Sequence, residues 1–110
     1  MKIESLCISA LDLQQSKSFW IDVIGLDLVS EHPGQAIVGD GVTELILDGE
    51  ISAPIELILG LDEEEFESLV AKLRDNGAEI LRDVKDWGGP LGLEITVLDP
   101  AGNRVCIHKK

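Results

Sequence analysis

The chain has 110 residues, enough for one domain and too few for two independent hydrophobic cores. Its hydrophobic content of 45% argues against disorder, and no apolar run approaches the roughly 20 residues that cross a bilayer. Nine Lys and Arg against 21 Asp and Glu give a net charge of −12, which disfavours nucleic acid and anionic membranes as partners. This charge favours a cationic ligand near an acidic cleft, unless it serves solubility alone.

The first half of the chain begins with a strand and a capped helix. Residues 6–10 form a short apolar run that predicts a strand. Asp12 follows, with Gln15 three residues later, which is the pattern of a capped helix start. Apolar residues then recur at helical spacing until Gly25, which we expect to end the helix in a left-handed conformation. Another strand is predicted at 26–29, and a hairpin of two further strands follows, at 36–38 and 45–47.

The second half repeats this order. A strand is predicted at 54–59, a helix begins with Asp62 and Glu65, Gly77 ends it, and a strand follows at 78–81. Its closing hairpin joins the runs 93–97 and 104–107 across a turn at 99–103.

The helix caps and the helix-ending glycines of the two halves lie at a nearly constant separation along the chain. This regularity indicates a duplication. We therefore predict an α+β fold: a single domain, 1–110, of two βαβββ modules, about 1–50 and 51–110. The strands would form a curved mixed sheet, a half-barrel, with the helices on its outer face and a ligand cleft on the other.

Side chains with chemistry are sparse. Cys7 and Cys106 lie in apolar runs without a CxxC spacing, which predicts buried free thiols. His32 precedes Pro33 and is expected in an exposed turn, whereas Trp20 lies on the helix stripe and is expected in the core. No nucleophile elbow, P-loop or dinucleotide motif is present.

Several segments carry motifs whose order is informative: 12–20 with 23–26, 73–79, 87–88 and 99–105. Together they resemble the glyoxalase/bleomycin-resistance/extradiol dioxygenase (vicinal oxygen chelate) superfamily. The resemblance spans nearly the whole chain and implies paired βαβββ modules around a cleft. It also implies one of two roles. Many members are metal-dependent lyases, isomerases, dioxygenases or thiol transferases, and another branch binds antibiotics without chemistry.

The resemblance implies metal-ligand positions at Ser5, Glu56 and Cys106, with Glu44 near the fourth. Serine is a poor ligand, and a thiol is too soft for the nickel, iron or manganese that such enzymes hold. We therefore expect no metal and no cofactor. One alternative is a zinc site of Cys106, His108 and Glu56, but the sequence favours His108 as a fraying C-terminal residue.

The predicted function is metal-free binding of a cationic or aromatic small molecule, as in bleomycin-resistance proteins. Trp87 lies in a glycine-rich loop where it would stack on a planar cation, or would instead anchor the loop to its own module. The predicted ligand-binding residues are Ser5, Glu44, Glu56, Trp87, Glu94, Cys106 and His108.

The alternatives are a metal-dependent lyase, isomerase or dioxygenase with a relocated metal site, and a scaffold module without a ligand. Open sheet edges predict a homodimer. The N-terminal residues show no signal-peptide pattern, which predicts a cytoplasmic protein.

Overall fold

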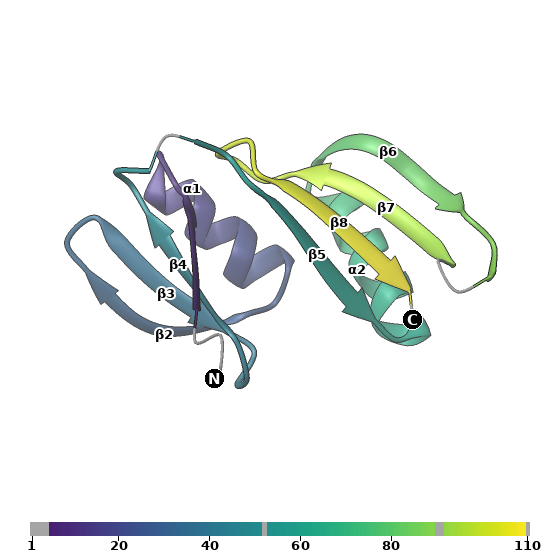
Figure 1. The fold of residues 1–110 in the computed structure, drawn as a ribbon, viewed down its shortest axis with the longest axis horizontal. Coiled ribbons are helices and arrows are strands. Elements are labelled where there is room, and N and C mark those ends of the chain that lie inside the picture. Colours follow the sequence, from purple (N-terminus) through teal and green to yellow (C-terminus); the bar gives the residue numbers. More distant parts are fainter. Residues whose placement is uncertain (1–4, 52, 90–91, 110) are drawn as a thin grey trace. The chain divides into compact units, whose positions relative to one another are not determined.

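The computed structural model describes residues 5–51, 53–89 and 92–109. The chain divides into two units: Met1–Ile55 with Pro100–Gly102, and Glu56–Asp99 with Asn103–Lys110. Each unit has a four-stranded mixed sheet with its helix packed on one face (Figure 1). The α+β fold with two βαβββ modules is therefore confirmed.

The first unit begins with an outer strand of its sheet, β1, which pairs with the last strand of the unit. Strand β1 pairs in parallel with β4, while β4–β3 and β3–β2 are antiparallel, giving the order β1-β4-β3-β2. Its elements are β1 (Ser5–Ser9), α1 (Leu13–Lys17), the π-helix η1 (Ser18–Val23), β2 (Asp27–His32), β3 (Gln35–Gly39) and β4 (Glu44–Asp48).

The second unit repeats that topology. Strand β5 is parallel to β8, the other two pairings are antiparallel, and the order is β5-β8-β7-β6. Its elements are β5 (Glu56–Leu61), α2 (Glu63–Asp75), β6 (Glu79–Asp86), β7 (Leu93–Leu98) and β8 (Arg104–Lys109). The parallel pairing explains why each unit needs its helix, which carries the chain back across the sheet.

Both predicted helix caps are present. The carboxylate of Asp12 accepts a hydrogen bond from the backbone N–H of Gln15 at 3.1 Å. Asp62 accepts from the N–H of Glu65 at 2.8 Å, and the Glu65 side chain accepts from the N–H of Asp62 at 3.4 Å. Only α2 thus has the reciprocal capping box, which satisfies two of the free N–H groups at its start.

The first helix differs from the expected continuous α-helix. It changes to π-helix after α1, and the N–H of Ile24 donates to the carbonyl of Phe19 at 2.9 Å. Phe19 and Trp20 meet edge to face at a ring separation of 5.3 Å, and Trp20 is fully buried, as predicted. Gly25 and Gly77 end the two helices with positive φ angles of 97° and 68°, also as predicted.

Strand alternation gives each sheet a helix-facing side and an opposite side. The helix-facing side of the second sheet is apolar and buried, and includes Leu57, Ile95, Val97, Val105 and Ile107. The first sheet buries Ile8, Ala36, Val38, Leu45 and Leu47 in the same way. Within the described residues, no helix is both long and apolar enough to span a bilayer.

Candidate functional site

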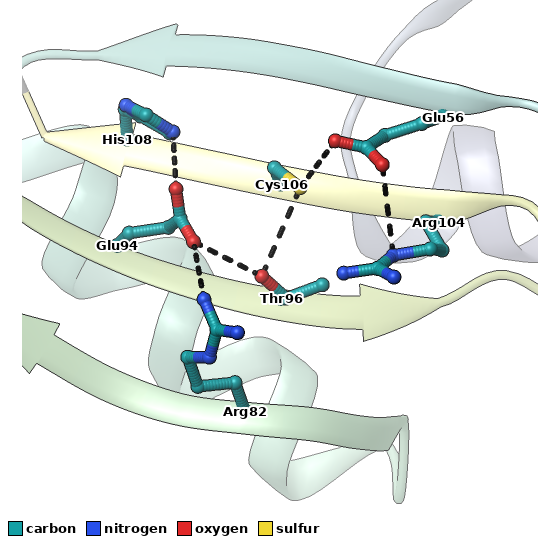
Figure 2. Close-up of polar contacts among 7 residues, drawn as sticks. All are labelled: Glu56, Arg82, Glu94, Thr96, Arg104, Cys106 and His108. Carbon is teal, nitrogen blue, oxygen red and sulfur yellow. Dashed lines mark hydrogen bonds and ion pairs between the residues drawn. The ribbon is translucent and has the colours of Figure 1, made fainter.

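The side of the second sheet that faces away from α2, here called the open face, carries a cluster of interacting polar side chains (Figure 2). Alternating positions on three strands bring these side chains together, and Arg82 on β6 joins them as the register partner of Thr96. Figure 2 shows the cluster spread across the sheet. From β5, β7 and β8 it contains Glu56, Glu94, Thr96, Arg104, Cys106 and His108.

Glu94 is the centre of the cluster. The residue is only 9% exposed, so its carboxylate depends on protein partners. Its Oε2 lies 2.5 Å from Nε2 of His108, and its Oε1 accepts a hydrogen bond from the hydroxyl of Thr96 at 3.2 Å. The guanidinium of Arg82 lies 3.6 Å from the same Oε1, an ion pair but not a hydrogen bond. Glu94 is thereby fixed in place and largely compensated.

Cys106 lies beside this pair as a protonated thiol. Its Sγ is 3.5 Å from Oε1 of Glu56, to which it donates, and 3.8 Å from the hydroxyl of Thr96. Burial raises the pKa of the Cys106 thiol, and the carboxylates of Glu56 and Glu94 raise it further, against an opposing hydrogen bond from Thr96. The group is therefore neither a ready nucleophile nor a ready metal ligand at neutral pH.

Trp87 follows directly after β6 and is 40% exposed. Its backbone N–H donates to the carbonyl of Gly92 at 2.8 Å, which closes the loop. Nζ of Lys85 lies 3.8 Å from its ring centroid, and the guanidinium carbon of Arg82 lies 5.2 Å from it. The indole already stacks with cations of its own strand, so an incoming cation would compete with them.

The predicted residues of the first unit form a separate arrangement. Ser5 and Glu44 are direct register partners across β1 and β4. On the same side of this sheet, Asp48 accepts a hydrogen bond from the amide of Gln35 at 2.9 Å and lies 3.8 Å from the thiol of Cys7. Of the predicted residues, Glu56 and Cys106, and Glu94 and His108, are in direct side-chain contact, whereas Ser5 and Glu44 are neighbours by strand register.

Two sequence-based predictions are wrong. His108 is not frayed: it lies within β8, between two paired strands, and its side chain is held by Glu94. Cys7 is exposed, because β1 is an outer strand of its sheet and its thiol points away from the helix. His32 is exposed, as predicted, although it ends β2 and the turn begins one residue later; it contacts Ser30 at 3.2 Å.

The donor set does not fit the divalent metal that the resemblance implies. Two of the positions hold a serine and a protonated thiol, and the carboxylate of Glu56 lies 3.7 Å from Nε of Arg104. Nε2 of His108 faces Glu94 rather than Cys106, which argues against the zinc alternative. Across residues 5–51, 53–89 and 92–109, no three His, Cys, Asp or Glu side chains form a group suited to an ion.

Three members of the cluster were not predicted from the sequence: Arg82, Thr96 and Arg104. A hairpin centred on Ala101 places Thr96 opposite Cys106, so the register of that hairpin is a signal that would have found it. Arg82 has no such signal, because β6 has register shifts on both sides of it.

Comparisons with known proteins agree with this architecture. The sequence model of the Glyoxalase/Bleomycin resistance protein/Dioxygenase superfamily matches residues 2–107. Metallothiol transferase FosB of Staphylococcus epidermidis is 27% identical, over 96% of this chain and 80% of that protein. TnmS3, an antibiotic binding protein from Streptomyces sp. CB03234, has a TM-score of 0.81 at 20% identity, covering 99% of this chain and 95% of that one. Lactoylglutathione lyase from Agrobacterium tumefaciens has a TM-score of 0.80 at 21% identity, covering 98% and 92%.

Proposed function

Because this chain belongs to the Glyoxalase/Bleomycin resistance protein/Dioxygenase superfamily, we propose that it is a metal-free small-molecule binding protein of the bleomycin-resistance type. The observation that carries the proposal is the state of Cys106. Where the resemblance implies a carboxylate ligand, this chain has a buried thiol held between Thr96 and Glu56. A hard divalent ion gains little from such a donor.

The rest of the donor set supports the same conclusion. Glu56 is both hydrogen-bonded by Cys106 and ion-paired with Arg104, so recruiting it to a metal would cost those interactions. Ser5 would have to lose its hydroxyl proton to bind an ion well. A binding role needs none of these changes.

The ligand is proposed to be cationic or aromatic, and the overall charge of −12 supports this at long range. The fold is also that of an antibiotic binding protein, TnmS3. The ligand-contacting residues of the proposal remain Ser5, Glu44, Glu56, Trp87, Glu94, Cys106 and His108.

Elemental analysis of protein purified without chelator or affinity tag tests the metal-free state, and we expect substoichiometric nickel, iron, manganese and zinc. Cys106→Glu restores a carboxylate beside Glu56 and is expected to raise the uptake of added manganese. Leu11→Glu, which adds a carboxylate at an exposed position of the first unit, serves as the matched control and should leave manganese uptake unchanged. Stoichiometric metal in the wild-type protein would contradict the proposal.

That outcome would favour the second candidate, a metal-dependent lyase, isomerase or dioxygenase with a relocated metal site. The similarity to FosB, a metallothiol transferase, supports a metal-dependent enzyme in general and not one of these three reactions. Binding itself is tested by thermal shift with a panel of cationic and planar aromatic antibiotics. A rise in Tm that saturates with concentration is expected for at least one compound. A panel with no stabilising compound would count against a binding role.

Two further proposals concern the protein's assembly and location. A homodimer would cover exposed sheet edges, and light scattering coupled to size-exclusion chromatography at micromolar concentration would detect it. A monomer under those conditions would reject the dimer. The cytoplasmic location is a prediction that fractionation of the producing cells would test.

A further inference from the structure

Three arginines of the second unit differ in how their guanidinium groups are used. Arg74 is fully engaged: it donates two hydrogen bonds to the carboxylate of Asp83, at 3.0 and 2.6 Å. The guanidinium groups of Arg82 and Arg104 have loose ion pairs, at 3.6 and 3.7 Å, and neither guanidinium donates a hydrogen bond within the part of the chain that is described. A guanidinium has five N–H donors, so both groups retain most of their hydrogen-bonding capacity.

Arg82 and Arg104 also lie on the same surface. Both belong to the open face of the second sheet, where Figure 2 shows them extending toward its polar cluster from different strands. Their side chains are 47% and 49% exposed, which leaves the planar forks accessible to a ligand. Lys85 adds a third cationic group close by, against the ring of Trp87 that Arg82 also approaches.

We propose that this face binds an oxyanionic group of the ligand, a carboxylate, phosphate or phosphonate, with Arg82 and Arg104 as its donors. Guanidinium forks match the geometry of such groups and form charge-assisted hydrogen bonds with them. The inference rests on the proposed binding function and deepens it: a ligand seated here has an anionic group whatever cationic or aromatic parts it also carries.

Two carboxylates oppose an incoming anion, and they are held differently. Glu94 is buried, accepts a hydrogen bond from Thr96 and contacts His108, and the guanidinium of Arg82 lies 3.6 Å from it, so a ligand oxyanion would share that guanidinium with Glu94. Glu56 is 51% exposed and is the ion-pair partner of Arg104. A ligand oxyanion would therefore take the place of the Glu56 carboxylate. The overall charge of −12 acts from longer range and is screened beyond about 8 Å at physiological ionic strength.

The experiment is a titration of ¹⁵N-labelled protein with inorganic phosphate at constant ionic strength, followed by the arginine side-chain N–H signals. Saturable shifts are expected at Arg82 and Arg104. Arg82→Gln and Arg104→Gln should each weaken phosphate binding about tenfold. Arg74→Gln, which removes an engaged guanidinium of the same unit, should leave phosphate affinity unchanged.

Glu56→Gln gives the sharpest test, because the sign of its effect depends on the ligand's charge. It removes the competing carboxylate charge and keeps an acceptor for the thiol of Cys106, so phosphate should bind several-fold more tightly. If the face binds cations instead, Glu56→Gln should weaken cation binding and leave the affinity for phosphate unchanged. Backbone spectra of every variant establish that it is folded.

Linear, unsaturated shifts, equal shifts at Arg74, or weaker phosphate binding by Glu56→Gln would each overturn the anion site. The proposed function fails by a separate route, through stoichiometric metal or the absence of any stabilising compound. A saturable phosphate site in a protein that also holds metal would therefore preserve this inference while rejecting the metal-free role.

Discussion

The two units have the same strand order and pairing, but the side of the sheet that faces away from the helix carries different polar groups in each. Equivalent register positions hold Gln35 and Asp48 in the first unit and Glu94 and His108 in the second. The first pair is a single amide–carboxylate hydrogen bond at 2.9 Å, partly buried. The second pair is the core of a charged cluster. Duplication has kept the topology and the apolar side while the polar side diverged.

The charges diverge as well. Residues 1–55 contain two basic and nine acidic side chains, whereas residues 56–110 contain seven basic and twelve acidic ones. The net charge of −12 therefore describes neither unit well: the first is almost purely acidic, and the second mixes both signs. A long-range attraction for cations and a local site for an anion are compatible because they act over different distances.

The largest expected effect separates the two tryptophans, one in each unit. Trp20 is fully buried against Phe19, so Trp20→Ala should lower the free energy of unfolding by about 3–5 kcal/mol. Trp87 is 40% exposed, so Trp87→Ala should cost less than about 1 kcal/mol. Urea unfolding followed by circular dichroism measures both. Equal losses would mean that the loop after β6 supports the fold.

The next effect compares the two equivalent polar pairs. Glu94→Ala leaves His108 and Thr96 without their shared acceptor and should cost about 2–3 kcal/mol. Gln35→Ala removes one part-buried hydrogen bond and should cost about 1 kcal/mol. The free energies of unfolding come from urea titrations at pH 7. A reversed order would show that the Gln35–Asp48 hydrogen bond contributes more to stability than the partners of Glu94 do.

A smaller effect compares the helix caps. Asp62→Ala breaks a reciprocal capping box and should cost about 1–2 kcal/mol, whereas Asp12→Ala breaks a single cap and should cost about 0.5–1 kcal/mol. Asp62→Asn and Asp12→Asn keep the acceptor oxygen and should recover most of each loss. If the asparagine variants behave like the alanine variants, capping is not the cause.

The smallest expected effect is a change in how the stability of the protein depends on pH. A hydrogen bond from Arg74, then one from the backbone N–H of Val84, lowers the pKa of Asp83 below its ordinary 3.8. The resulting stability is present above that value and is lost as the pH falls through the lowered pKa. Arg74→Gln should therefore reduce the stability lost between about pH 5 and about pH 3.

The matched control lies in the first unit. The pKa of Asp48 is lowered chiefly by the backbone N–H of Glu50 and secondly by the amide of Gln35. Gln35→Ala should therefore change the acid dependence less than Arg74→Gln does. Urea midpoints at the two pH values would detect either difference, and an unchanged acid dependence in Arg74→Gln would contradict the argument.

Local signals in the sequence predicted most of the fold. Asp12 and Asp62 cap the helices, Gly25 and Gly77 end them, and the hairpins lie where turn residues separate apolar runs. Such features depend on residues a few positions apart, which a sequence displays directly. The change to π-helix after α1 has no comparable signal.

The polar cluster was harder to predict because it depends on distant partners. From the sequence, His108 looks like a loose chain end. It is ordered because its strand β8 pairs with β5, which lies some fifty residues earlier in the chain. Cys7 occupies an apolar run, yet an outer strand leaves one of its sides uncovered. Which side of a strand is buried follows from tertiary pairing, and alternation alone does not decide it.

The outer strand β6 has a consequence for association. It is the last strand of its sheet, its register with β7 shifts twice, and Arg82, Asp83, Lys85 and Asp86 alternate in sign along it. Bulges and charges of this kind hinder the docking of a foreign strand. Uncontrolled fibre-like growth should therefore not begin at β6, and any partner copy would have to attach by another surface.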